Sequence, residues 1–333
     1  MIHKFLIIGA GMIGDVHART LIGMGYEVAL CDAYEQNLRK LAEKYSISEL
    51  YTDVNAALAE TDAEAAVICT PNHLHAAVAI QAMEKGLDVL CEKPMAATVA
   101  QAREMLAASE RTGRHLMIGY IVRAYDALDK VMEVLRSEAL GKVISARCVL
   151  ATPETLDVAR TKYRRSYETG GGIIYDYTHE LDYCRMMFGS AKDVFAFCGS
   201  YLRRDESVDD SADMLIRYQS GVVLSLHMDY IQRAGRTGYS RSFEIICEKG
   251  VLECDFHSVK VCFNDGEEQA FHFEPDWAKT FPKQADRFIR LCAGEMNVPH
   301  ASAQDGLKAL ELADALYHSA REESWFKPCD VRS

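Results

Sequence analysis

Residues 1–120 alternate short apolar runs with stretches of helical periodicity, and this alternation constrains the fold more strongly than any other feature of the chain. The runs at 5–8 and 65–69 are almost continuously apolar, as expected of strands that are covered on both faces of a sheet. Segments such as 12–24 and 35–45 carry apolar residues at helical spacing. Because strands that alternate with helices form parallel βαβ units, the pattern predicts a doubly wound parallel sheet.

A glycine motif, Gly9-Ala10-Gly11-Met12-Ile13-Gly14, follows the first apolar run and opens the first helical segment. In such a motif the first glycine permits a tight turn, the second lets the backbone approach a pyrophosphate, and the third lets the helix meet the strand. Amide groups at the helix N-terminus then face the anion. The residues expected to bind a dinucleotide here are Gly9, Gly11, Met12, Ile13 and Gly14.

Asp32 ends the second apolar run, about 20 positions after the glycine motif. A carboxylate at this place accepts hydrogen bonds from the ribose hydroxyls of NAD and repels the 2′-phosphate of NADP. Ala33 follows, so neither Arg nor Ser stands beside it to bind a phosphate. The sequence therefore predicts a preference for NAD(H) over NADP(H). A surface aspartate that caps a helix is the alternative interpretation.

The periodicity changes after residue 120, and strand-like segments dominate residues 143–273. The pairs Ser220-Gly221 and Lys249-Gly250 are typical of tight hairpin turns, so this second sheet should be largely antiparallel. The helices expected in this half lie at 125–138, 174–188, 277–292 and 303–321.

A chain of 333 residues is longer than one hydrophobic core usually serves, so two domains are expected. We predict an NAD-binding Rossmann domain over residues 1–120. Residues 121–333 should form a mostly antiparallel α+β domain for substrate binding and oligomerisation. The helix at 303–321 is expected to pack back on the first domain.

The composition excludes several classes of protein. The formal net charge of −12 disfavours binding to a nucleic acid, and no stretch has the length of about 20 apolar residues that a membrane span needs. The eleven cysteines include no Cys-x-x-Cys pair, which favours free thiols in a reducing cytosol over disulfides or a metal centre. We therefore expect a cytoplasmic protein with no metal site.

Two further segments follow strands of the first half, where doubly wound sheets bind their ligands. They are Thr70-Pro71-Asn72-His73-Leu74-His75 and Glu92-Lys93-Pro94. Together with the glycine motif, these segments resemble the glucose–fructose oxidoreductase/inositol dehydrogenase family (Gfo/Idh/MocA). The resemblance implies that the cofactor lies against Thr70, Asn72, His75, Glu92 and Lys93, and that the bond before Pro94 is cis. It also implies that His73 and His75 are not a metal pair.

The resemblance assigns catalysis to Lys93 and His179. A lysine beside the cofactor can stabilise charge on a substrate oxygen, and a histidine can exchange the hydroxyl proton. A solvated lysine and a core histidine are the alternatives. Asp176 is the third catalytic candidate, although only two residues separate it from His179 whereas similar sequences have three. Positions i and i+3 of a helix share a face, so both side chains can reach one pocket. The alternative is that His179 keeps its place and Asp176 is displaced.

Residues near these segments are candidates for binding substrate. By resemblance, Arg123 falls where the family often places an arginine that touches substrate. Tyr163 and Arg164 stand in a short basic cluster that could bind a carboxylate or a phosphate, or could simply be solvated. Gly170-Gly171-Gly172 ends four positions before Asp176 and indicates a close approach of the backbone to a ligand or a movable loop, with a simple linker as the alternative.

The resemblance implies an NAD(P)-dependent oxidoreductase that transfers a hydride between nicotinamide and a secondary alcohol of a sugar, cyclitol or sugar-derived acid. Two alternatives stay open. One is an enzyme with tightly bound NAD that uses transient oxidation, as an epimerase, a glycosidase-like enzyme or a sugar–sugar oxidoreductase does. The other is a non-catalytic regulator that senses dinucleotides. We expect a homodimer or homotetramer.

Overall fold

The computed structural model describes residues 2–152, 167, 171–201, 208–231, 240–296 and 300–328. The chain divides into two compact units. Unit 1 contains residues 1–124 and 276–307, and unit 2 contains residues 125–275 and 308–333. The chain therefore passes between the units three times, after Ala124, Pro275 and Leu307.

Unit 1 is built on a six-stranded parallel sheet with the strand order β3-β2-β1-β4-β5-β6. The order reverses between β1 and β4, which is the arrangement of a doubly wound sheet and confirms the predicted fold. The elements are β1 (Lys4–Ile8), α1 (Met12–Gly23), β2 (Glu27–Cys31), α2 (Glu35–Tyr45), β3 (Leu50–Tyr51), α3 (Val54–Glu60), β4 (Ala65–Ile68), α4 (Asn72–Glu84), β5 (Asp88–Cys91), α5 (Val99–Thr112), β6 (Leu116–Ile118), the 3₁₀ helix η1 (Ile121–Ala124) and α9 (Trp277–Cys292).

The core of unit 1 includes a helix that is distant in sequence. Apolar residues of β1 and α1 pack against Ala285, Phe288 and Leu291 of α9. The rings of Phe5 and Phe288 lie 6.5 Å apart, centre to centre. A helix that follows the second sheet in sequence is therefore part of the core of unit 1.

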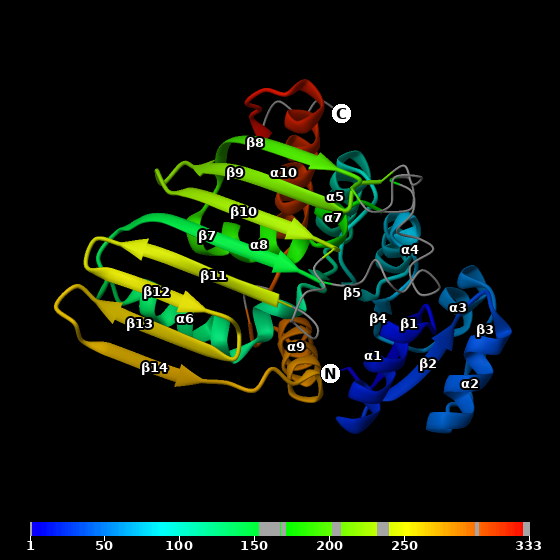
Figure 1. Cartoon of the computed structure of the whole chain (residues 1–333). Helices are drawn as coiled ribbons and strands as arrows, with labels where there is room; N and C mark the ends of the chain where they lie inside the picture. The colour runs from blue at the N-terminus through cyan, green and yellow to red at the C-terminus, as the bar shows by residue number, and fades with distance from the viewer. Residues whose placement is uncertain are drawn as a thin grey trace. The chain divides into compact units, whose positions relative to one another are not determined.

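Unit 2 contains an eight-stranded sheet with the order β14-β13-β12-β11-β7-β10-β9-β8. Among the strands that the structure describes here, only the central pair β7 and β10 is parallel, so the prediction of a largely antiparallel sheet is confirmed. Figure 1 shows the strands side by side, with α6 and α8 behind them. The elements are α6 (Asp126–Arg136), β7 (Val143–Ala151), α7 (Ile173–Asp176), α8 (Thr178–Phe188), β8 (Ala191–Gly199), β9 (Ser211–Tyr218), β10 (Val223–Asp229), β11 (Ser240–Cys247), β12 (Gly250–Cys254), β13 (Ser258–Phe263), β14 (Glu268–His272) and α10 (Ala303–Glu322), which begins in unit 1.

We expected a single helix at 174–188, and this is wrong: the structure has two helices, α7 and α8, which one residue separates. Tyr177 has φ −106° and ψ 44°, which is not helical, and it separates α7 from α8. Asp176 and His179 thus belong to different helices. The rule that positions i and i+3 share a helical face does not apply to them, because the rule requires a continuous helix.

Two further predictions concern the chain as a whole. No helix in the described ranges is both long enough and apolar enough to cross a membrane. The cysteines among the described residues are free thiols, as expected, and most of them are buried. Burial raises the pKa of Cys31 to about 12 and places the pKa of Cys91 well above its usual range, so both thiols stay protonated and act as packing groups.

Candidate functional site

The turn after β1 has the geometry that its glycines predict. Gly9 has φ +106°, and a Cβ there would lie 2.5 Å from the carbonyl carbon of Cys69. A Cβ on Gly14 would lie 2.0 Å from the carbonyl oxygen of Gly9. A Cβ on Gly11, in contrast, would meet no atom within 4 Å. The first and third glycines therefore let the chain pack closely, and the second leaves open space in front of α1.

Asp32 lies beside this turn. Its carboxylate accepts hydrogen bonds from the N–H of Ala10 at 2.7 Å and from the N–H of Tyr34 at 2.8 Å. The side-chain amide of Asn37 donates a third, at 3.3 Å. These contacts fix the carboxylate next to the glycine motif, which is where a residue that binds the adenosine ribose must lie.

Thr70 and Asn72 provide a test of whether the residues of unit 1 fit a dinucleotide. Among the described residues, the buried atoms Thr70 Oγ1 and Asn72 Nδ2 have no hydrogen-bond partner. Such atoms carry a free-energy cost unless a ligand or water satisfies them. Asn72 is the first residue of α4, and Thr70 comes just before its N-cap, Pro71. Unpartnered donors and acceptors together with the open space at Gly11 fit NAD.

His75 contacts two backbone carbonyl groups. Its Nδ1 lies 2.8 Å from the oxygen of Pro94, and its Nε2 lies 2.8 Å from the oxygen of Thr70. The ring is 1% exposed, and burial lowers its pKa. Both ring nitrogens are thus engaged by the protein. His75 connects the loop after β4 to the loop after β5, and its predicted contact with the cofactor stays a prediction.

Glu92 and Lys93 follow β5 directly. Glu92 Oε1 lies 2.8 Å from Nε2 of the buried His17 on α1. Gly119 makes room for this carboxylate, because a Cβ there would lie 2.9 Å from Glu92 Oε2. Lys93 is partly exposed, and the bond between Lys93 and Pro94 is cis, as expected. Glu92 therefore joins the loop that carries Lys93 to the helix of the glycine motif.

In unit 2, Asp176 contacts a residue that the sequence analysis missed. The hydroxyl of Tyr230 donates a hydrogen bond of 2.5 Å to Asp176 Oδ2, and both residues are almost fully buried. Tyr230 also packs against the ring of Tyr177, with the centroids 5.6 Å apart. The one signal in the sequence was its place directly after a strand, β10. His179 is 7% exposed on α8.

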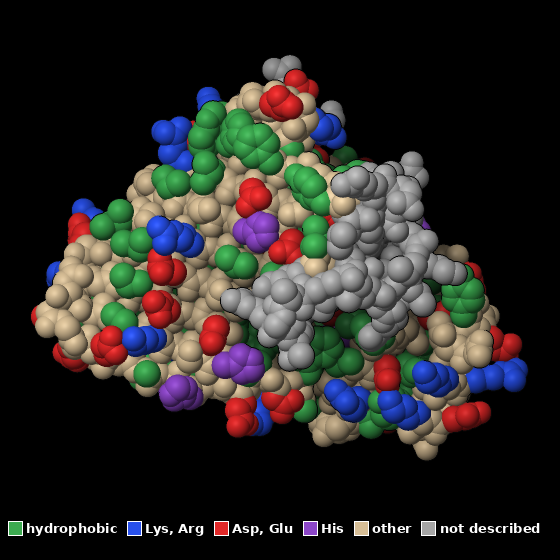
Figure 2. All heavy atoms as spheres, in the orientation of Figure 1, with side chains coloured by type: hydrophobic (Ala, Val, Ile, Leu, Met, Phe, Trp, Pro, Cys, Tyr) green, Lys and Arg blue, Asp and Glu red, His purple; other side chains and the backbone are tan. Residues whose placement is uncertain are grey.

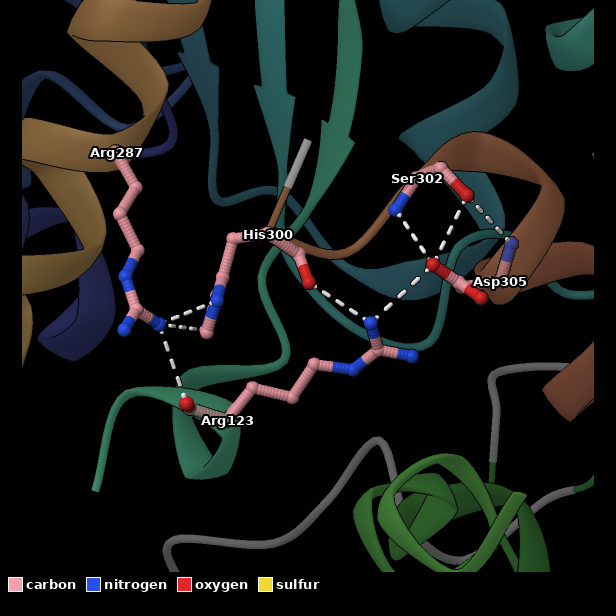
Figure 3. A network of polar contacts seen from close by, with 5 residues as sticks. All are labelled: Arg123, Arg287, His300, Ser302 and Asp305. Atoms are coloured by element: carbon pink, nitrogen blue, oxygen red, sulfur yellow. Dashed lines mark hydrogen bonds and ion pairs between the residues drawn. The ribbon is translucent and has the colours of Figure 1, made fainter. Parts of the chain in front are cut away.

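Arg123 is buried and belongs to a partly buried polar network of unit 1 (Figure 3). Its guanidinium donates to the carbonyl oxygen of His300 at 2.8 Å and to Asp305 at 3.2 Å. Asp305 also accepts from the N–H and the hydroxyl of Ser302, and Arg287 donates to the ring of His300. Burial, followed by the charges of Arg287, Arg123 and a nearby lysine, lowers the pKa of His300 to about 2. The contact of Arg123 with substrate stays a prediction.

Three of the other candidates, Tyr163, Arg164 and Gly170, lie outside the described residues. No group of three or more His, Cys, Asp or Glu side chains is arranged to hold a metal ion in the part of the chain that the structure describes.

Comparisons with known proteins give the family and the fold of the chain. Residues 3–120 match a family described as "Oxidoreductase family, NAD-binding Rossmann fold", and residues 128–253 match the "GFO/IDH/MocA C-terminal domain". The chain is 29% identical to D-apiose dehydrogenase of Paraburkholderia graminis, over 96% of this chain and 88% of the relative. It is 27% identical to myo-inositol 2-dehydrogenase of Thermotoga maritima, over 95% and 96%.

Solved structures share the fold over the full chain. An oxidoreductase from Agrobacterium radiobacter, in complex with NAD+, L-tartaric acid and magnesium, superposes with a TM-score of 0.91 at 20% identity and covers 100% of both chains. A levoglucosan dehydrogenase in complex with NADH superposes with a TM-score of 0.88 at 22% identity, over 97% of this chain and 98% of that one.

Proposed function

This chain belongs to the GFO/IDH/MocA family of NAD-binding oxidoreductases, and from that premise we propose that its substrate is a secondary alcohol of a sugar, cyclitol or sugar-derived acid. The observation that carries the proposal is similarity over almost the whole chain to two relatives named as dehydrogenases of apiose and of inositol. Neither the enzyme with tightly bound NAD nor the dinucleotide-sensing regulator gains support from these comparisons.

Lys93 is our candidate for the group that acts on the substrate oxygen. Its ammonium would donate a hydrogen bond to that oxygen and stabilise the negative charge that develops there during oxidation. Bound NAD supplies the acceptor for the hydride that leaves the carbon. The links from His75 and Glu92 to the neighbouring loops support this role, because they hold the segment around Lys93 in place.

His179 is our candidate for the acid/base. Imidazole exchanges protons readily at neutral pH, so it can take the hydroxyl proton during oxidation and return it during reduction. Asp176 would orient the substrate by accepting a hydrogen bond from a hydroxyl. Tyr230 holds one oxygen of Asp176 and thereby fixes the direction of the other.

The experiment that tests these roles follows NADH formation with a panel of cyclitols, pentoses, hexoses and sugar acids. Lys93→Ala and His179→Ala should each lower kcat by about 10²-fold or more, while the Kd of NADH changes by less than about threefold. The exposed Lys85, which lies in the same unit, provides a matched control in Lys85→Ala. If Lys93→Ala keeps the wild-type kcat, Lys93 has no role in catalysis.

We also propose that the chain forms a homodimer or homotetramer through the outward face of the eight-stranded sheet. Figure 2 shows this face, with hydrophobic side chains gathered where Figure 1 places β8. Phe197, Leu215 and Trp325 are 58%, 41% and 54% exposed, and large apolar side chains grouped on a surface favour association.

Light scattering coupled to size-exclusion chromatography tests this assembly. The double variant Phe197→Glu/Leu215→Glu should elute at the mass of a monomer, because it places charges within the face. Leu50→Glu, which changes a residue of unit 1 with 37% exposure, should keep the wild-type mass. A double variant with the wild-type mass would assign the interface to another surface.

A further inference from the structure

The N-terminus of α7 is capped by residues that lie far from it in sequence. The N–H of Ile173 donates a 3.0 Å hydrogen bond to Asp209 Oδ2. The N–H of Ile174 donates a 3.3 Å hydrogen bond to the hydroxyl of Tyr317 on α10. The local N-cap residue, Gly172, has no side chain to do this. The first backbone donors of α7, which a helix cannot satisfy itself, are therefore satisfied from two other segments.

Asp209 and Tyr317 also contact each other. The hydroxyl of Tyr317 donates to Asp209 Oδ1 at 2.9 Å, and the hydroxyl of Tyr167 donates to the same oxygen at 2.7 Å. Asp209 is 4% exposed and Tyr317 is 5% exposed. Burial raises the pKa of Asp209, while these hydrogen bonds act to lower it. The carboxylate thus accepts three hydrogen bonds, two from hydroxyl groups and one from the helix.

The capping side chains lie so close to Gly172 that they leave no room for a Cβ there. A Cβ at this position would lie 2.4 Å from the hydroxyl oxygen of Tyr317 and 2.8 Å from Asp209 Oδ1. Its φ of +94° is also one that other residues rarely adopt. The glycine run predicts a close approach of the backbone to a ligand, and this stays a prediction; the groups that Gly172 approaches in the structure are side chains of the protein, among them the two capping residues.

The candidate Asp176 lies only four positions after Gly172, the N-cap of α7. α7 extends from Ile173 to Asp176, and the non-helical Tyr177 then leads into the helix of His179. A four-residue helix has little stability of its own, because nucleating a helix costs more than one turn returns. The direction in which α7 starts, and with it the position of Asp176, therefore depends on what holds its first N–H groups.

We propose that Asp209 and Tyr317 are positioning residues of the reaction: they hold α7 so that Asp176 and His179 are placed for catalysis. This inference rests on the proposed roles of those two residues. Asp209 and Tyr317 touch neither substrate nor cofactor in this proposal. They act through the backbone of α7 alone.

The test compares Asp209→Asn and Tyr317→Phe with Tyr167→Phe. Asparagine replaces one acceptor oxygen of Asp209 by a donor, and phenylalanine at 317 removes the acceptor for Ile174 N–H. Each should lower kcat by about tenfold or more, because small displacements of reacting groups cost rate steeply. The Kd of NADH should stay within about twofold, since the predicted cofactor residues lie in unit 1. His179→Ala should abolish one limb of the pH–kcat profile. In Asp209→Asn and Tyr317→Phe the same limb should shift to a different pH.

Tyr167→Phe is the matched control. It removes a hydroxyl that donates to the same oxygen of Asp209 and accepts from the N–H of Asp209 at 3.3 Å, but accepts nothing from α7. Its kcat should therefore stay within about threefold of wild type. Hydrogen exchange of residues 171–178, followed by mass spectrometry, gives a readout that does not depend on turnover. The exchange of this segment should speed up in Asp209→Asn and Tyr317→Phe and stay unchanged in Tyr167→Phe.

The possible failures are distinguishable. If His179→Ala turns over normally, the acid/base role proposed for His179 is wrong. If His179→Ala is inactive but Asp209→Asn and Tyr317→Phe keep the wild-type kcat and exchange rates, the positioning role is wrong. If Asp209→Asn does not fold, Tyr317→Phe decides, because it keeps the buried ring and changes only the hydroxyl.

Discussion

The carboxylate of Asp32 accepts hydrogen bonds from the backbone N–H groups of Ala10, in the glycine motif, and of Tyr34. It is therefore fixed beside the turn at which the cofactor is predicted to bind. His75 was predicted to contact the cofactor, but both of its ring nitrogens contact backbone carbonyl groups of unit 1. Tyr230 was not foreseen at all, although it binds the candidate Asp176 directly. At this scale, a motif places a residue near a site, but only its neighbours decide what the side chain does.

Asp32→Ala should weaken the discrimination between the two dinucleotides. Removing the carboxylate removes the hydrogen bonds to the ribose hydroxyls and the repulsion of a 2′-phosphate. We expect the KM of NAD to rise by about tenfold and the preference for NAD over NADP to fall by a similar factor. Steady-state kinetics with both cofactors measures this. Asp53→Ala is the control, because Asp53 accepts a hydrogen bond from Ala56 N–H as the cap of α3. A preference that Asp32→Ala leaves unchanged would contradict the role of the carboxylate.

The elements differ in how firmly the sequence determines them. Helix α1 contains two glycines with opposite surroundings: Gly14 packs against the backbone of Gly9, whereas a Cβ added at Gly23 would meet no atom within 4 Å. Helix α7 is determined less firmly. It ends before Tyr177, although the sequence there has an apparently continuous helical pattern. Long periodic segments thus form where expected, and the short element at the candidate site depends on tertiary contacts.

Gly14→Ala and Gly23→Ala should have opposite effects on stability. The added methyl group at Gly14 would meet the carbonyl oxygen of Gly9 at 2.0 Å, so we expect a loss of about 2–4 kcal/mol in the free energy of unfolding. At Gly23 the same change should leave the stability unchanged or raise it by up to about 1 kcal/mol. Urea unfolding followed by circular dichroism measures both. Equal effects of the two variants would disprove the close packing at Gly14.

On the scale of the whole molecule, the chain crosses between its units three times, and the network in Figure 3 lies close in sequence to all three crossings. Arg123 is followed by the first crossing, and α9, which carries Arg287, begins directly after the second. Residues 300–305 come just before the third. One network therefore joins the two segments of unit 1, 1–124 and 276–307, whose ends lead to the other unit. Its histidine is surrounded by cationic side chains.

The network should make the stability depend on pH. The pKa of His300 is about 2 in the folded chain and about 6.5 for an ordinary histidine. Between these values the unfolded chain binds a proton that the folded chain does not, so the free energy of unfolding falls as the pH drops below about 6.5. His300→Gln should lose less stability than wild type between about pH 7.5 and pH 5. Urea unfolding across this range tests it, with the exposed His73→Gln as control. Parallel pH profiles for wild type and His300→Gln would refute the prediction.

Apart from the break between α7 and α8, the order of strands and helices, the parallel and antiparallel sheets and the turn at Gly9–Gly14 could be derived from the sequence. These features depend on local periodicity and on backbone conformations that only glycine adopts readily. Both are determined by residues that are neighbours in the sequence. The partners of the candidate site residues were decided by the tertiary structure. Ile173 meets Asp209, Asp176 meets Tyr230, and Arg123 meets Asp305. These hydrogen bonds join residues that are 36 to 182 positions apart. No local periodicity predicts them, and only the folded backbone brings the partners together.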